Sequence, residues 1–156
     1  MDNQLATGLP TRERIQQFQK LVEGVQVPQP EPDHLFAPGM YMRKLIVPKG
    51  MCIVGKIHRH DHFLLVLSGK ALVISEFGRD IVEAGHTSVS KAGVKRVVVA
   101  IEDTLFATIH HNPSDTQDLY EIEAAHIEPE PEQFAVKPLA ASECSHMIDI
   151  KGGATS

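Results

Sequence analysis

The stretch KIHRHDHFLLVLSG (residues 56–69) places three histidines at alternate positions and follows them with an apolar run and a glycine. Alternate residues of a β-strand point to the same side, so His58, His60 and His62 are expected to share one face. The run that follows them predicts a strand ending in a turn. The stretch therefore indicates either a metal site or a polar cluster at the rim of a β-structure.

Residues 39–112, which surround this stretch, are rich in short β-prone runs separated by turn residues. The runs are MYMRKLIV (40–47), MCIVGKIH (51–58), FLLVLSG (63–69), KALVISEF (70–77), RDIVEAG (79–85), KRVVVAI (95–101) and TLFATIHH (104–111). Many short strands with close turns predict an all-β antiparallel sandwich or barrel. Alternation predicts a core on one side of the strands, formed by Leu45, Val47, Ile53, Ile57, Leu65, Leu67, Leu72, Ile74, Val89, Val97, Val99, Leu105 and Ala107.

The flanks differ from this central segment. Residues 1–38 are expected to hold an amphipathic helix with Thr11 as N-cap and Ile15 and Phe18 on its apolar side, followed by a stiff arm with prolines at 28, 30, 32 and 38. Residues 113–126 predict a helix that opens with a capping box from Ser114 to Gln117. Residues 127–156 show no sustained period and are expected to form an extended tail.

Composition narrows the class of protein. The 156 residues carry a net charge of −5 and no basic cluster, which argues against a nucleic-acid partner. Cys52 and Cys144 lie far apart with no CxxC spacing and are expected to be reduced thiols. Neither a secretory signal nor an apolar run long enough to span a membrane is seen, so we expect a cytoplasmic protein with no membrane partner.

The spacing of glycines and histidines resembles that of the cupin superfamily, in particular small single-domain RmlC-like cupins. The first cupin motif is matched by Gly50, Lys56, His58, His62 and Gly69, with Lys56 in place of its first histidine and His62 in place of its glutamate. The second is matched by Gly85, Lys91, Gly93, Arg96 and Ala100, and it has lost its histidine. The resemblance implies a double-stranded β-helix (jelly-roll barrel) whose metal motif is degenerate.

Two interpretations of the site stay open. In the first, His58 and His62 lie with Lys56, Arg96 and His110 at a polar barrel mouth that holds no metal, because a cation beside lysine and arginine is disfavoured. In the second, His58, His60 and His62 bind a divalent transition metal, with His110 or His111 approaching from a neighbouring strand. The remaining histidines, His34, His86, His126 and His146, are expected to be solvated.

The sequence supports hypotheses from different functional classes. The first is a non-enzymatic structural or assembly protein, and residues 104–124 are loosely similar to cupin-like proteins of tailed bacteriophages, which implies a virion component. The second is a metal-dependent cupin enzyme, such as a small-molecule dioxygenase or isomerase. A small-ligand sensor is the third.

Self-association is expected through a sheet face or through exchanged arms, with a dimer as the default and a larger protein assembly as a further partner. The tail offers apolar residues for such contacts, and they are Phe134, Val136, Leu139, Met147 and Ile148.

Overall fold

The computed structural model describes residues 9–23 and 30–129, with the backbone alone for residues 21–23. Two antiparallel sheets dominate it. The five-stranded sheet has the order β1-β2-β9-β4-β7 and consists of β1 (Asp33–Ala37), β2 (Met40–Val47), β9 (Thr104–His111), β4 (His62–Ser68) and β7 (Thr87–Ser90). The four-stranded sheet has the order β3-β8-β5-β6 and consists of β3 (Cys52–Val54), β8 (Arg96–Ala100), β5 (Lys70–Ser75) and β6 (Arg79–Glu83).

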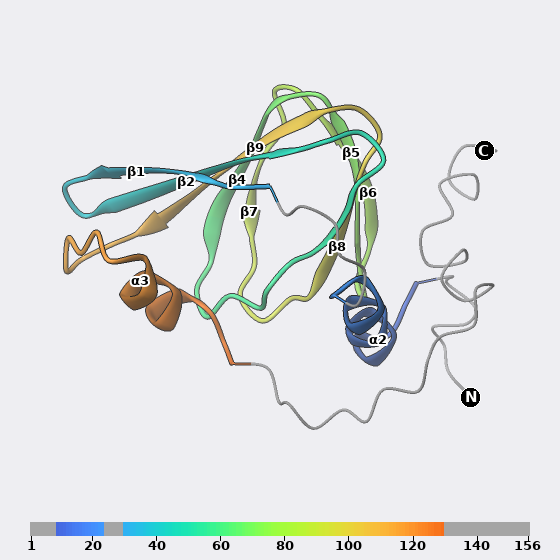
Figure 1. Cartoon of the computed structure of the whole chain (residues 1–156), viewed down its shortest axis with the longest axis horizontal. Helices are drawn as coiled ribbons and strands as arrows, with labels where there is room; N and C mark the ends of the chain where they lie inside the picture. The colour runs from blue at the N-terminus through green and yellow to red at the C-terminus, as the bar shows by residue number, and fades with distance from the viewer. Residues whose placement is uncertain (1–8, 24–29, 130–156) are drawn as a thin grey trace.

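The antiparallel strand pairs are nested in sequence, with the β5–β6 hairpin innermost. β5 pairs with β6, β4 with β7, β3 with β8 and β2 with β9, all antiparallel. The chain is thus a long two-stranded ribbon that winds from one sheet to the other and encloses a barrel (Figure 1). This arrangement is a double-stranded β-helix of the jelly-roll type, which confirms the all-β fold class predicted from the sequence.

Each predicted run corresponds to one strand: β2 and β9 match their runs in full, and β4, β5, β6 and β8 match theirs to within two residues. β1 lies in the proline-rich arm and pairs with β2 at the edge of its sheet, where Pro32 and Pro38 on either side of β1 cost no ladder hydrogen bond. β7 was not predicted. The run at residues 51–58 gives only the short β3, because the chain leaves the sheet after Val54 and returns as an isolated bridge between His58 and Ile127.

Two helices flank the barrel. Helix α2 (Arg12–Glu23) confirms the N-terminal prediction, with the Thr11 hydroxyl accepting a hydrogen bond from the Arg14 amide. Helix α3 (Leu119–His126) begins later than predicted, because its N-cap is Asp118, whose carboxylate accepts from the Tyr120 amide. The capping box from Ser114 to Gln117 is wrong, since Asp115 in that segment has a φ of 52° and cannot continue a helix.

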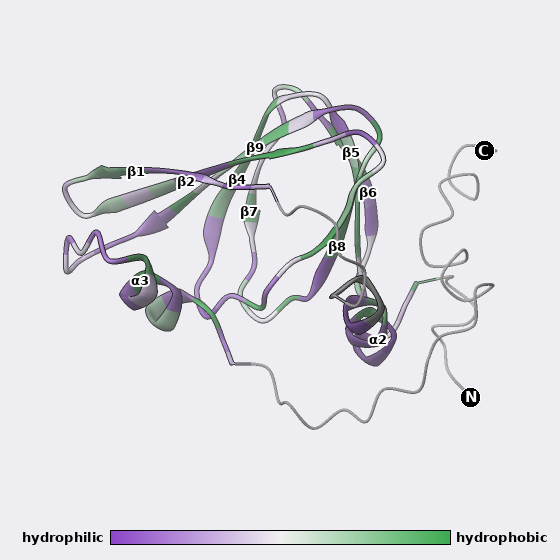
Figure 2. Cartoon of the chain, viewed as in Figure 1, coloured by the Kyte–Doolittle hydropathy of each residue, from purple (hydrophilic) through white to green (hydrophobic). Residues whose placement is uncertain are grey.

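The core has two parts on opposite sides of the four-stranded sheet. Inside the barrel lie Val47, Val66, Ala71, Val82, Ala100 and Phe106. Under α2, on the outer face of the sheet, lie Ile15, Phe18, Leu72, Ile74, Val97 and Val99. In Figure 2, β8 is largely hydrophobic, and α2 is mostly hydrophilic.

The prediction that all core residues face one side is therefore wrong. The four-stranded sheet buries both faces, so Leu72 and Val97 point away from the barrel although they are buried. On the five-stranded sheet the outward positions include Leu67 and Val89, which are 48% and 50% exposed. β4 turns His62, Leu64 and Val66 inward instead of Leu65 and Leu67.

The four motif glycines, Gly50, Gly69, Gly85 and Gly93, all have positive φ, between 77° and 93°. Gly69 joins β4 to β5 with a φ of 86°, and a Cβ there would lie 2.1 Å from the backbone oxygen of Asp103. These glycines are therefore requirements of the fold.

No helix in the described ranges is long and apolar enough to cross a membrane.

Candidate metal centre and pocket

Three histidines meet at the mouth of the barrel. His58 follows β3, His62 begins β4 and His110 lies near the end of β9. Their ring centroids are 4.3 Å apart for His58 and His62, 4.6 Å for His62 and His110, and 5.5 Å for His58 and His110. One ring nitrogen of each lies within 4.8 Å of those of the other two. We call these three residues the inner histidines.

Strand alternation explains this convergence. On β9, Phe106, Thr108 and His110 occupy alternate positions that face the barrel interior, and His110 pairs in register with Tyr41 of β2. On β4, His62 faces the same interior and pairs with Ser90. Because side chains alternate between the two faces of β4 and β9, the imidazoles of His62 and His110 both point into the barrel, although they are far apart in sequence.

His60 takes a different position. It lies with His111 and His126 in an adjoining group, in which ring centroids are 4.8 Å apart for His60 and His111 and 5.3 Å for His111 and His126. His126, on α3, also lies 5.3 Å from the inner His110. The structure therefore pairs the predicted His58 and His62 with His110, and it places His60 outside this set.

The prediction that His126 is solvated is wrong, because only 6% of it is exposed. Helix α3 packs over the barrel mouth and carries His126 with it. His34 and His86 also have partners: Nδ1 of His34 lies 2.6 Å from the Tyr41 hydroxyl, and Nε2 of His86 lies 3.0 Å from the Ser88 hydroxyl. His146 and the predicted tail contacts Phe134, Val136, Leu139, Met147 and Ile148 lie outside the described residues.

Burial keeps the inner histidines neutral. Desolvation, with the neighbouring His62 and Arg96 as further causes, lowers the pKa of His58 to about 4. Desolvation, with His62 and His58 next, lowers the pKa of His110 to about 3. The pKa of His62 is also lowered, mainly by desolvation. At neutral pH these imidazoles present lone pairs, which is the state that a metal ion requires.

Hydrogen bonds engage one ring nitrogen of His110 and one of His62. Nε2 of His110 lies 2.9 Å from the Thr108 hydroxyl, and no described residue forms a hydrogen bond with its Nδ1. Nδ1 of His62 lies 3.5 Å from the His60 carbonyl, a weak contact that leaves Nε2 free. Partners of this kind on the second nitrogen fix the orientation of metal-binding imidazoles. The inner histidines therefore fit a divalent transition metal such as zinc, iron, nickel or copper.

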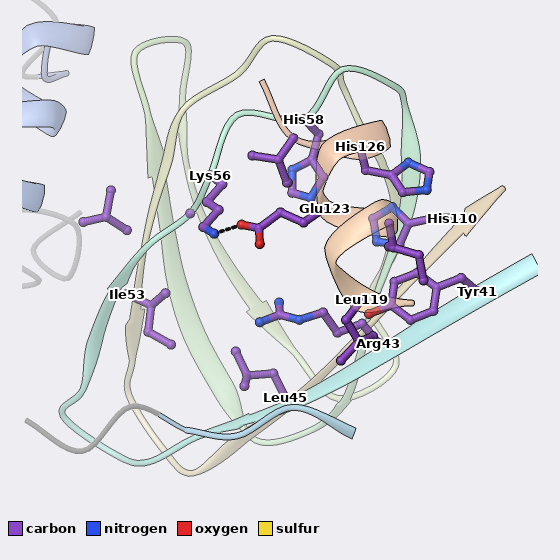
Figure 3. A pocket seen from close by; sticks show the side chains of 14 residues that line it. Tyr41, Arg43, Leu45, Ile53, Lys56, His58, His110, Leu119, Glu123 and His126 are labelled. Atoms are coloured by element: carbon purple, nitrogen blue, oxygen red, sulfur yellow. Dashed lines mark hydrogen bonds and ion pairs between the residues drawn. The ribbon is translucent and has the colours of Figure 1, made fainter. Parts of the chain in front are cut away.

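A pocket of about 380 Å³ opens beside the inner histidines, in the size range of small-molecule sites. Figure 3 shows His58, His110 and Tyr41 on its wall, with Leu119 and Glu123 contributed by α3. A second cavity of about 140 Å³ lies among inward residues of both sheets, and we call it the deeper cavity. His58, His62, apolar residues and several polar and cationic residues line it. Arg43, Leu45, Ile53, Gly55, Lys56 and His58 line both.

Cationic side chains line the same space. Lys56 and Arg96, which were predicted at the barrel mouth, line the deeper cavity, and Lys56 forms an ion pair with Glu123 of α3 (Figure 3). Arg43 of β2 joins them and was missed by the sequence analysis. Its alternation with Tyr41 and Leu45 on a strand with an inward apolar face was the signal that could have identified it. No comparable signal placed Glu123 or His126 at the mouth.

Known proteins give a match in structure only. No protein-family model matches the chain, and no curated protein matches it in sequence. A cupin-2 domain protein from Shewanella frigidimarina is 14% identical over 61% of this chain and 92% of its own, with a TM-score of 0.47. KdgF from Halomonas sp. is 18% identical over 62% and 87%, with a TM-score of 0.49.

A further solved structure is an RmlC-like cupin from Shewanella frigidimarina, 16% identical over 62% of this chain and 85% of its own, with a TM-score of 0.49. The fold itself follows from the strand order, in which four nested antiparallel pairs wind between two sheets. The described domain therefore has a double-stranded β-helix fold.

Proposed function

We propose that the barrel binds a divalent transition metal through His58, His62 and His110 and acts on a small molecule in the adjoining pocket. The observation that carries this proposal is the approach of three neutral ring nitrogens to within 4.8 Å of one another at the wall of a 380 Å³ pocket. His110 supplies the ligand that the degenerate second cupin motif lacks. The reaction class is that of a dioxygenase or isomerase.

The chain's own residues have clear roles in this function. A bound metal would supply Lewis-acid chemistry to a coordinated oxygen. The inner histidines hold that position, with Thr108 fixing the ring of His110. Helix α3 lines the pocket, and its C-terminal end is hydrogen-bonded to the histidine stretch: the Arg59 amide donates to the His126 carbonyl and the Glu128 amide to the Ile57 carbonyl.

The test is metal analysis of the purified full chain. We expect near-stoichiometric metal in the wild type and at least about tenfold weaker Zn²⁺ binding in His62→Ala and His110→Ala. His86→Ala, outside the cluster, is the matched control and should bind like the wild type. His60→Ala should also retain binding, because His60 lies outside the inner histidines. Wild-type protein that binds no divalent metal, with its fold intact by circular dichroism, would exclude this function.

A second candidate function is a structural or assembly role, and one surface favours it. Leu35, Met42, Ile109, Phe63 and Val89 stand in register across all the strands of the five-stranded sheet. Leu35, Phe63 and Val89 are 47%, 57% and 50% exposed. Such a stripe is typical of a protein–protein interface, here with a second copy of the chain in the first instance. In a phage-encoded protein the assembly would be a virion; otherwise it would be cytoplasmic.

Sedimentation of the full chain tests this role. We expect a dimer or larger species that Phe63→Asp converts to the 17.2 kDa monomer. Phe77→Asp is the matched control, since Phe77 is more exposed but lies in the β5–β6 turn of the other sheet. A monomeric wild type at micromolar concentration would count against the assembly role.

A further inference from the structure

Two arginines, one on each sheet, line the same cavity. Arg43 lies on β2 of the five-stranded sheet and Arg96 on β8 of the four-stranded sheet, and both line the deeper cavity. His58 and His62 line it with them. Arg43 also lines the larger pocket together with His58 and His110. The arginines and the proposed metal centre therefore belong to one site.

The charge of this site is not balanced by the protein. Among the described residues that line the pocket and the deeper cavity, Glu123 is the only carboxylate, and it is paired with Lys56. The remaining side chains that are always charged, Arg43 and Arg96, leave a net charge of about +2. A concave site with uncompensated positive charge and low-dielectric walls concentrates anions.

The two guanidiniums make almost no hydrogen bonds with the residues that the structure describes. Each carries five N–H donors. The side chain of Arg43 makes no hydrogen bond or ion pair with any described residue, and that of Arg96 reaches only the Val94 carbonyl at 3.4 Å. Burial lowers the pKa of Arg96, which marks the cost of placing its charge there. Arg43 is exposed to solvent at the pocket and Arg96 is partly buried, so a bound anion would supply acceptors to Arg96 and would replace water at Arg43.

The walls around these charges are apolar and suit a carbon skeleton. They are formed by Leu45, Ile53, Leu64, Val73, Val98 and Phe106. Inorganic phosphate would pair with the arginines but would gain nothing from these side chains. An organic carboxylate gains both, because a planar carboxylate matches the fork of a guanidinium and its apolar body buries surface.

We propose that the barrel binds a small organic carboxylate, with Arg43 and Arg96 as the anion-binding residues and the apolar walls around its carbon chain. This proposal rests on the proposed small-molecule function and specifies its substrate class. Three neutral histidines bring no negative charge to a divalent metal, and two guanidiniums repel it. A carboxylate offsets that repulsion, so it should strengthen metal binding, and the metal should strengthen carboxylate binding by the same factor.

Binding measurements on the full chain test the proposal. Benzoate and butyrate are titrated by NMR or calorimetry into metal-free and Zn²⁺-loaded protein, with benzamide and butyramide as neutral counterparts. We expect each carboxylate to bind at least about tenfold more tightly than its amide. Arg43→Met and Arg96→Met should each weaken carboxylate binding about tenfold, and Arg79→Met, whose side chain lines neither cavity, should not.

Arg43→Lys keeps the charge and is a second variant if Arg43→Met does not fold; it should bind benzoate more tightly than Arg43→Gln. Failure of both carboxylates to saturate at about 10 mM, equal binding of the amides, or binding of phosphate alone would overturn the proposal. If Zn²⁺ binds to the inner histidines while carboxylates do not bind, the metal function stands and the substrate class falls. If carboxylates bind through the arginines while Zn²⁺ does not, the reverse holds.

Discussion

His62 and His110 stack with their ring centroids 4.6 Å apart and their planes 25° from parallel, although one begins β4 and the other nearly ends β9. Both are 7% exposed. Two imidazolium ions cannot be held so close in a desolvated site, so burial and mutual repulsion lower the pKa of His110, and burial lowers that of His62. The contact therefore depends on the neutral state of both rings.

The first prediction concerns the pH dependence of stability in metal-free protein. An unfolded histidine titrates near pH 6.5, whereas folding lowers the pKa of His58 to about 4 and that of His110 to about 3. Between these values the unfolded chain binds more protons than the folded one, so stability rises with pH. The free energy of unfolding should thus be greatest above pH 6.5 and fall as the pH drops towards 4.

Urea unfolding at a series of pH values, after removal of metal, measures this dependence. His110→Gln replaces the buried imidazole with a neutral side chain and should flatten the curve between pH 6.5 and 4. His86→Gln should keep the wild-type slope. An unchanged slope in His110→Gln would show that the inner histidines do not cause the acid sensitivity.

The second prediction concerns the ion pair between Lys56 and Glu123. Both side chains are more than half exposed, so Glu123→Gln should change the free energy of unfolding by less than about 1 kcal/mol. The same substitution leaves Lys56 uncompensated at the pocket, which should tighten benzoate binding. Glu121→Gln on the same helix, outside the pocket lining, is the control. Weaker benzoate binding in Glu123→Gln than in Glu121→Gln would contradict this electrostatic argument.

The third prediction concerns the turn between β4 and β5. Gly69→Ala forces a side chain into a φ of 86° and against the Asp103 backbone, so it should lower the free energy of unfolding by at least about 2 kcal/mol. Gly78→Ala, in the next turn, meets no atom within 4 Å and should change it by less than about 1 kcal/mol. Thermal unfolding of the two variants provides the comparison, and similar melting temperatures would refute it.

The sequence predicted those parts of the fold that local pattern determines. Short β-prone runs between turn residues identified every strand except β1 and β7, and the motif spacing identified Gly69 and the other turn glycines. Thr11 was correctly placed as an N-cap because capping involves residues within one turn. The sequence did not identify Asp118 as the N-cap of α3, because a turn precedes it and the helix begins only at Leu119.

The site was less predictable because its parts meet through tertiary structure. Motif spacing brings His58 and His62 together, and His110 was predicted at the same barrel mouth, but the choice between His110 and His111 as a third ligand stayed open because strand register decides it. His60 alternates with its neighbours in sequence, yet the chain forms no strand there and His60 points to another group. The two-sided burial of β8 depends on the docking of α2, which no strand pattern encodes.

The last prediction uses this docking. Ile15 and Phe18 are buried against Leu72 and Val97 on the outer face of the four-stranded sheet, and Cys52 packs against the same cluster. Removal of the Phe18 ring should therefore cost about 3–5 kcal/mol or detach α2 from the sheet. Lys20→Ala, at an exposed position of α2, is the control and should be nearly neutral.

The reactivity of the Cys52 thiol distinguishes loss of stability from detachment of α2. Burial raises the pKa of its thiol to about 12, so little reactive thiolate exists at pH 8 while α2 is docked. In a Cys144→Ser background, Phe18→Ala should speed the reaction of Cys52 with a disulfide reagent, and Lys20→Ala should not. Circular dichroism of the same samples separates detachment of α2, which leaves the β-signal intact, from global unfolding. If Cys52 reacts at the same slow rate in Phe18→Ala and the barrel remains folded, α2 does not protect this face of the sheet.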